Sequence, residues 1–149
     1  MNYYNEIKNI LVDNAIGRKV REYKSNQKDL ESYYNVGKLL VEAQGGEERA
    51  KYGNGLIKEY SKRLTSELGK GYSVRSLTDM RTFYSFCQKR QSLIAEFKFR
   101  NISWTCITKL LKLDDINAIF YYVKCIGEMN LTTRELDSKL KLKEYERLD

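Results

Sequence analysis

The sequence predicts an all-α fold, a single helical domain over residues 1–149 with a long N-terminal helix and one or two helix-turn-helix units. Three observations predict it. Proline is absent from all 149 residues, although average usage is roughly 5%. Glycine occurs only nine times. Apolar residues recur at steps of three and four along most of the chain, which is the period of a helix and not of a strand.

Residues 1–44 are expected to form one long helix or a helix pair. The polar run Lys24-Ser25-Asn26-Gln27 predicts a kink or a short break. The alternating steps of four and three are typical of a helix that packs along its length against another. The partner is either a second copy, giving a homodimer, or the core of the same chain. The residues that set this rhythm are Ile16, Val20, Tyr23, Leu30, Tyr34, Gly37 and Val41.

Residues 51–90 are expected to form a helix-turn-helix. Gly69 stands where a left-handed C-cap is needed, and Ser73 stands where an N-cap hydroxyl belongs. In a helix-turn-helix the second helix enters a DNA groove, but two packed helices of any bundle give the same pattern. The first apolar stripe is Leu56, Ile57, Tyr60, Leu64 and Leu68, and the second is Val74, Leu77, Met80 and Tyr84.

The charge of the protein is concentrated in this middle part. The chain has a net charge of +7, and residues 1–50 and 101–149 are each neutral, so residues 51–100 carry all of it. Such an excess is expected of a phosphate-binding surface, and the alternative is a solvated face that maintains solubility. The predicted nucleic-acid contacts are Lys58, Lys62, Arg63, Lys70, Arg75, Thr78 and Lys89, with Arg75 and Thr78 placed to reach base edges.

The C-terminal unit, residues 101–149, is expected to contain three helices. Ser103 and Asp114 are the predicted N-caps of the first two, and Thr132 with Glu135 forms a capping box for the third. Its balanced charge favours a scaffold or a protein contact. A second phosphate contact would use Arg134, Lys139 and Lys141.

Several classes of function are excluded or disfavoured by composition. The chain has no His, so an imidazole-based triad is excluded and a zinc site lacks ligands. Of the acid-x-Lys pairs, which are part of a two-metal nuclease site, only Glu96-Phe97-Lys98 lies outside a predicted helix. We therefore expect no enzyme activity, no metal and no cofactor. Cys87, Cys106 and Cys125 are expected to be buried free thiols.

The location expected from the sequence is cytoplasmic. No apolar run reaches the length of a membrane span, and the N-terminus lacks the basic start and apolar stretch of a signal peptide.

From about residue 30 to its end, the chain resembles the N-terminal domain of YhcG-type proteins, which are bacterial and phage-borne. The motifs that carry the resemblance include Tyr33-Tyr34-x-x-Gly37, Gly69-Lys70-Gly71-Tyr72-Ser73, Ile102-Ser103-Trp104, Arg134-Glu135-Leu136 and Tyr145-Glu146-Arg147-Leu148. The resemblance implies a helical domain of DNA-binding type, usually followed by a PD-(D/E)xK nuclease domain. Three departures stand out: Cys106 where the family usually has His, Leu131 where it usually has Trp, and a chain that stops at Asp149, about where the nuclease domain would begin.

Two functions follow as alternatives. The first is a nucleic-acid-binding module, for DNA or RNA, in a nuclease-associated or mobile-element system. The second is a phage or mobile-element protein that binds and inhibits a host defence complex, such as a CRISPR or restriction complex, by protein contact.

Overall fold

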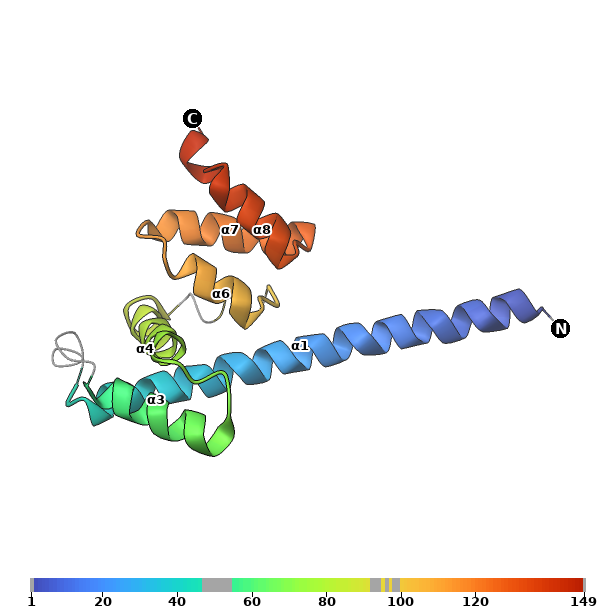
Figure 1. The fold of residues 1–149 in the computed structure, drawn as a ribbon. Coiled ribbons are helices and arrows are strands. Elements are labelled where there is room, and N and C mark those ends of the chain that lie inside the picture. The colour runs from blue at the N-terminus through green and yellow to red at the C-terminus, as the bar shows by residue number, and fades with distance from the viewer. Residues whose placement is uncertain (1, 47–54, 92–94, 96, 98–99, 149) are drawn as a thin grey trace.

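The computed structural model describes residues 2–46, 55–91, 95, 97 and 100–148, and within these ranges it contains helices and no strand. The predicted all-α fold is confirmed. Residues 47–54, which lie between the first two predicted helical units and include the start of the second, are outside the described residues, as are Glu96 and Lys98. The helices are α1 (Tyr3–Ala43), α3 (Gly55–Leu68), α4 (Val74–Lys89), α6 (Trp104–Leu110), α7 (Ile116–Met129) and α8 (Thr133–Lys141), followed by a 3-10 turn, Tyr145–Arg147 (Figure 1).

Helix α1 is continuous over 41 residues, so the predicted kink or break at 24–27 is wrong. The polar residues there have another role. Asn26 is buried, and its side-chain amide donates to the side-chain oxygen of Asn101 at 3.0 Å. Asn101 has a left-handed backbone, with φ of 55°, and it lies just before α6. This amide pair therefore attaches α1 to the C-terminal unit without interrupting the helix.

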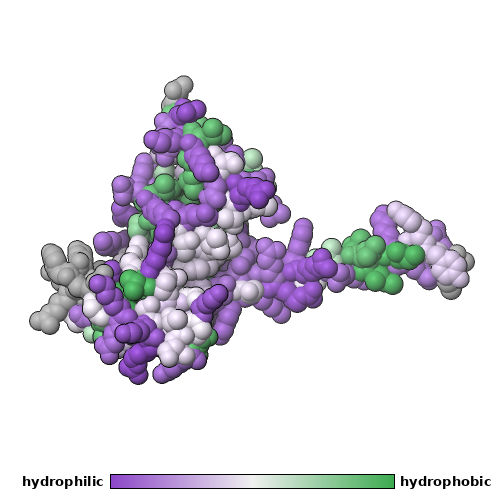
Figure 2. Space-filling model, viewed as in Figure 1, coloured by the Kyte–Doolittle hydropathy of each residue, from purple (hydrophilic) through white to green (hydrophobic). Residues whose placement is uncertain are grey.

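The N-terminal part of α1, residues 3–25, projects away from the rest of the molecule, and we call it the arm (Figure 1). Apart from the half-buried Gly17, every residue of the arm is exposed. Part of this surface is apolar, as Figure 2 shows on the projecting helix. Ile16, Val20 and Tyr23, predicted as part of one packing stripe, are 56%, 46% and 46% exposed. The large exposed apolar side chains of the arm are Tyr3, Tyr4, Ile7, Ile10, Leu11, Val12, Ile16, Val20 and Tyr23.

The C-terminal half of the same stripe packs as predicted. Leu30, Gly37 and Val41 are buried, and α4 lies against this face of α1. At Gly37 the two backbones come very close: a Cβ there would overlap the carbonyl oxygen of Met80 and lie 2.8 Å from the Cβ of Tyr84. Glycine is required at this crossing because any larger side chain would push the helices apart.

Two hydrophobic clusters share the core. The smaller one contains Leu40, Ile57, Leu77 and Met80 and joins α1, α3 and α4. The larger one joins α1 and α4 to the C-terminal unit, with Trp104 packed against both clusters. The fully buried side chains of the larger cluster include Leu30, Phe83, Ile102, Ile107, Leu110, Tyr122 and Leu136.

The helix starts largely follow the prediction. Ser73 and Ser103 accept from the backbone N–H groups of Ser76 and Cys106, and the Thr132–Glu135 capping box is present. The cap of α7 is Asp115, which accepts from the N–H of Asn117, and not Asp114. No described helix combines the length and the low polarity needed to cross a bilayer.

Candidate nucleic-acid interface

The candidate interface is the corner formed by α3, the turn 69–73 and α4. Two left-handed glycines, Gly69 and Gly71, with φ of 98° and 109°, allow the chain to reverse. The buried hydroxyl of Ser61 on α3 donates to the carbonyl oxygen of Tyr72 at 2.7 Å and fixes the turn against α3. In Figure 1, α4 is seen nearly end-on, whereas α3 runs across the view. The two helices therefore cross at a large angle, as the predicted helix-turn-helix requires.

The surface of this corner is basic. Residues 55–90 contain eight Lys and Arg and three acids, a net charge of +5 (8 − 3). Among the residues that the structure describes, none of the predicted cations here forms an ion pair: the described ion pairs are Lys109–Asp137 and Lys139–Glu144. Lys58, Lys62, Arg63, Lys70, Arg75 and Lys89 are all exposed.

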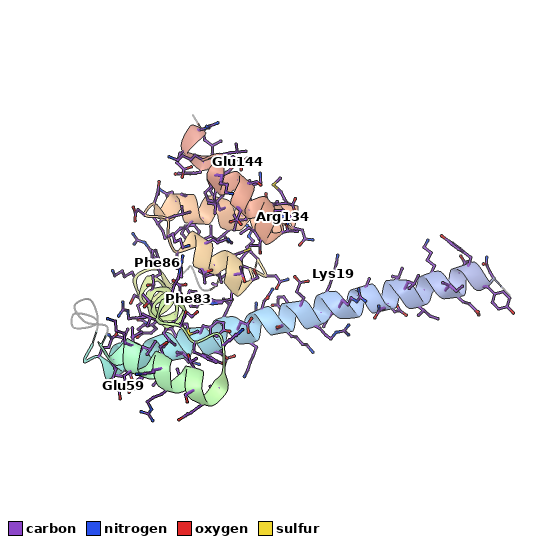
Figure 3. The ribbon with its side chains drawn as sticks, in the orientation of Figure 1. Lys19, Glu59, Phe83, Phe86, Arg134 and Glu144 are labelled. Carbon is purple, nitrogen blue, oxygen red and sulfur yellow. The ribbon has the colours of Figure 1, made fainter. Side chains whose placement is uncertain are left out.

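The three predicted cations of α3 do not lie on one face. Ile57 and Ser61 face the core. At 100° per residue, Lys58 and Lys62 lie on one flank of the exposed surface and Arg63 on the other. Arg63 has Glu59 and Glu67 four residues before and after it, which place acids beside it. Figure 3 shows Glu59 projecting from α3 into solvent. Lys58 and Lys62 are therefore the stronger candidates on this helix.

Helix α4 is less accessible than a free recognition helix. Arg75 is exposed at its first turn, but Thr78 is half-buried and its hydroxyl donates to the carbonyl oxygen of Val74 at 2.7 Å. Phe86, which helix periodicity alone would place toward the outer face of α4, is half-buried and packs against the larger hydrophobic cluster. Lys89 lies beside Arg90 and Asp114 at the far end of the helix. Of the predicted base-reading pair, only Arg75 is exposed, and the carboxyl group of Asp79, one helical turn later, is near enough to interact with its charge.

A further cation, Lys112, comes close to this helix from the connection between α6 and α7. Burial raises the pKa of the Asp79 carboxyl, and the charges of Arg75 and Lys112 oppose that rise. Two bases, one on α4 itself and one on the α6–α7 connection, therefore act on Asp79. No local pattern points to Lys112, because it lies 33 positions after Asp79 in the chain.

In the C-terminal unit, the predicted second phosphate contact is only partly available. The ammonium group of Lys139 lies 3.0 Å from a carboxylate oxygen of Glu144, and this hydrogen bond raises the pKa of Lys139. Arg134 and Lys141 are exposed. Figure 3 shows Arg134 and Glu144 at different positions along this unit.

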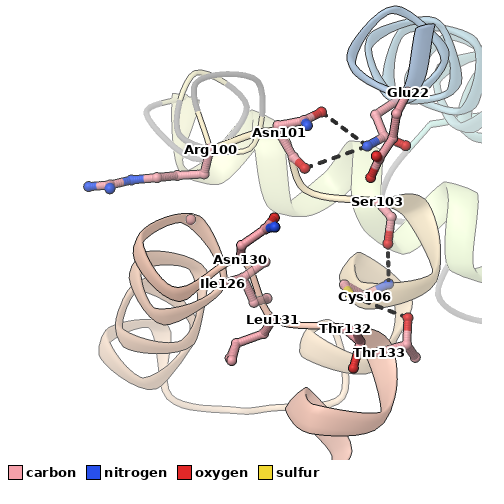
Figure 4. Close-up of a pocket in the computed structure, with 12 residues that line it drawn as sticks. Glu22, Arg100, Asn101, Ser103, Cys106, Ile126, Asn130, Leu131, Thr132 and Thr133 are labelled. Carbon is pink, nitrogen blue, oxygen red and sulfur yellow. Dashed lines mark hydrogen bonds between the residues drawn. The ribbon is translucent and has the colours of Figure 1, made fainter. Parts of the chain in front are cut away.

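A polar pocket of about 580 Å³ lies where the arm leaves the body (Figure 4). Its polar groups bond largely to one another: Ser103 accepts from the N–H of Cys106, and the Cys106 thiol lies 3.7 Å from the Thr133 hydroxyl. The pocket therefore lies between α1, the C-terminal end of α7 and the N-terminal end of α8. Its lining also includes Glu22, Asn26, Arg100, Asn101, Ile126, Asn130, Leu131 and Thr132.

Cysteine chemistry and metal binding find no support in the described residues. Cys87 and Cys106 are buried and Cys125 is half-buried, all as free thiols. Burial raises the pKa of the Cys87 thiol to about 12, so it is not a thiolate at neutral pH. The described part of the chain has no cluster of three His, Cys, Asp or Glu side chains suited to a metal ion.

Comparison with known proteins gives two matches. The family described as the DUF1016 N-terminal domain matches residues 7–147. The Escherichia coli (strain K12) protein named "Putative nuclease YhcG" is 31% identical over 165 residues, which cover 92% of this chain and 44% of YhcG. The chain therefore spans less than half the length of that relative. No solved structure matches the chain.

Proposed function

This chain belongs to the family of the DUF1016 N-terminal domain, the nuclease-associated N-terminal domain of YhcG-type proteins, and from that premise we propose that it is a DNA-binding module without catalytic activity of its own. The observation that carries the proposal is the set of exposed cations on the α3–α4 corner, which have no ion-pair partner among the described residues. Exposed cations without an ion-pair partner are suited to bind phosphate oxygens.

In the proposed complex, Lys58, Lys62 and Lys70 contact phosphates from α3 and the turn, and Arg75 extends from the first turn of α4 toward the groove. Arg63 and Lys89 supply weaker contacts at the edges, because acids lie near both. Thr78 supports α4 more than it reads bases, since its hydroxyl is bonded to Val74. Such a surface gives affinity and orientation with limited sequence readout.

Binding to a 30-base-pair duplex is expected to weaken steeply with salt. About six neutralised phosphates give a slope of log affinity against log salt of roughly −5. Lys62→Glu with Arg75→Glu removes two contacts and adds two repulsive charges, so binding should fall at least about 100-fold at 100 mM salt. A titration by fluorescence anisotropy measures both effects.

The matched control is Lys124→Glu with Lys143→Glu. It makes the same change in net charge at two exposed sites of the C-terminal unit. Equal weakening by both double variants would mean that only overall charge matters and would contradict the proposed interface. So would wild-type binding that does not change with salt.

The apolar tip of the arm is the basis of a proposed homodimer. Tyr3, Tyr4, Ile7, Ile10 and Leu11 are exposed, are symmetric in sequence about Ile7, and lie within about 60° of it on the helix. Two antiparallel tips would place Ile7 against Ile7 of the second copy, and Tyr4 against its Leu11. Parallel arms would instead bring Arg18, Arg21 and Lys24 of both copies together, which like charges oppose.

Ile7→Glu is expected to weaken this dimer at least about tenfold, because two carboxylates then meet at its centre. Asn9→Glu is the control: it is also exposed and lies on the opposite side of the tip. Sedimentation equilibrium measures the difference. A wild-type protein that stays monomeric at about 100 µM, a concentration that detects weak association, would contradict the dimer.

The alternative function, inhibition of a host defence complex by protein contact, uses the same apolar tip to bind another protein. A pull-down from nuclease-treated host lysate separates the two functions. A partner retained after nuclease treatment and lost with Ile7→Glu supports the inhibitor, whereas loss of all capture on nuclease treatment supports the nucleic-acid module.

A further inference from the structure

One face of α1 between residues 14 and 35 contains neither an acidic nor an apolar residue. At 100° per residue this face covers about 120° of the helix surface. Of the charged residues between positions 14 and 35, this face contains four of the five bases and none of the three acids. We call it the α1 basic face. Its members are Asn14, Gly17, Arg18, Arg21, Lys24, Ser25, Lys28, Ser32 and Asn35.

The four bases of this face are accessible. Arg18, Arg21, Lys24 and Lys28 are exposed, and within the described ranges none of them takes part in an ion pair. Their Cα atoms span about 15 Å along the helix. A Cβ added to Gly17 would lie 3.3 Å from the guanidinium of Arg21, so the Arg21 side chain folds back over the glycine.

The other members of the face are small or amide side chains, which allow close approach and donate hydrogen bonds. A helix of about 10–12 Å in diameter fits the major groove of duplex DNA, which is about 12 Å wide. The arm also projects free of the body, so neighbouring helices do not block its approach (Figure 1). In these respects α1 is better placed than α4, on which Thr78, Asp79 and Phe86 are all half-buried.

The C-terminal end of the α1 basic face lies on the same segment of α1 as Tyr33, which is near the turn between α3 and α4. In Figure 1 the turn between α3 and α4 lies against α1 near the point where the arm leaves the body. The pKa of Tyr33 on α1 is raised mainly by burial and further by the charges of Asp29 and Tyr72. Tyr72 belongs to the α3–α4 turn, so this turn is close to Tyr33. The turn that carries Lys70 is therefore near the segment of α1 that follows Lys28, although Tyr33 and Lys28 lie on different sides of the helix.

We infer that the α1 basic face is a second nucleic-acid contact, which lies along duplex DNA while the α3–α4 corner grips the adjoining phosphates. This inference rests on the proposed DNA binding and moves the groove contact from α4 to α1. Arg18, Arg21, Lys24 and Lys28 contact phosphates, and Asn14, Ser25 and Ser32 face the groove. The apolar tip, residues 3–11, is not needed for this contact.

The test compares two double variants of the full chain that differ only in which face of α1 loses charge. Arg21→Gln with Lys24→Gln removes two bases from the α1 basic face. Lys8→Gln with Lys19→Gln removes two from the opposite side, on which Figure 3 shows Lys19 pointing away from the helix. Both pairs are exposed, and each double variant lowers the net charge of the chain by the same amount. Circular dichroism checks that helix content is unchanged.

The first double variant is expected to weaken binding to a 30-base-pair duplex about tenfold at 100 mM salt and to make the salt slope shallower by nearly two, because two phosphate contacts are lost. The second should change affinity by less than about threefold. Single-stranded DNA and RNA of the same length should bind wild type more weakly than the duplex does.

Equal effects of the two double variants would overturn the inference, and so would single strands that bind as tightly as the duplex. The proposed function fails separately. If wild type shows no salt-dependent binding to any nucleic acid, the α3–α4 interface is wrong as well. If Lys62→Glu with Arg75→Glu abolishes binding while Arg21→Gln with Lys24→Gln has no effect, only the α1 contact is wrong.

Discussion

Gly37→Ala is expected to lower the free energy of unfolding by about 3 kcal/mol or more, at the upper end of the usual cost of overpacking. The new methyl group would overlap the carbonyl oxygen of Met80, a backbone atom that moves only if the whole of α4 moves. For a domain of this size the expected fall in Tm is roughly 6–12 °C. Thermal unfolding followed by circular dichroism at 222 nm measures it.

Gly17→Ala provides the matched comparison on the same helix. There the Cβ would meet only the flexible end of Arg21, at 3.3 Å. Since alanine favours a helix by up to about 1 kcal/mol over glycine, Tm should stay the same or rise. If Gly37→Ala and Gly17→Ala lowered Tm by the same amount, the close crossing of α1 and α4 would not be the cause of the destabilisation.

Phe83→Ala is expected to cost about 3–5 kcal/mol, as for other large-to-small changes of buried aromatic residues. Phe83 is fully buried and its ring meets three others: Tyr34 on α1 at 6.5 Å, Trp104 on α6 at 5.3 Å and Phe97 at 5.8 Å between ring centroids. Its removal opens a cavity where α1, α4 and the C-terminal unit meet. Urea unfolding at 25 °C measures the loss.

Phe86→Ala, three residues later on the same helix, is the comparison. Phe86 is half-buried and packs against the same cluster, whereas Phe83 is fully buried within it. A cost below about 1.5 kcal/mol is expected because less apolar surface leaves water. A larger cost for Phe86→Ala than for Phe83→Ala would contradict the described packing of α4.

The local features of the fold were predictable from the sequence. The N-caps at Ser73 and Ser103 and the capping box at Thr132 depend on residues three positions apart. Such short-range hydrogen bonds need no tertiary information. The same holds for the left-handed glycines of the α3–α4 turn.

What packs against each helix was harder to predict. The spacing of Ile16, Val20 and Tyr23 continues that of Leu30, Gly37 and Val41, yet the first three are exposed and the last three buried. Periodicity tells which face is apolar but not where the body of the protein ends. In the same way Asn26 looked like a helix breaker, because its partner Asn101 is 75 positions away.

For the candidate interface, the sequence identified the basic segment but not its shape. Helix periodicity separates Arg63 from Lys58 and Lys62, but the α6–α7 loop that carries Lys112 toward Asp79 depends on the tertiary fold. The charge totals also concealed the α1 basic face, because residues 1–50 are neutral overall. Only the projection of one continuous helix separates those bases from the acids.

The unbroken helix α1 fixes the distance between its N-terminal end and the body of the protein. From Tyr3 to Asn26, its first buried residue, the distance is about 35 Å at 1.5 Å per residue, close to the length of one turn of B-form DNA. Because a helix resists stretching, a molecule bound at the N-terminal end of α1 is held at a fixed distance from a molecule bound by the body of the protein. Spacing in this protein is therefore encoded by the number of residues in one helix.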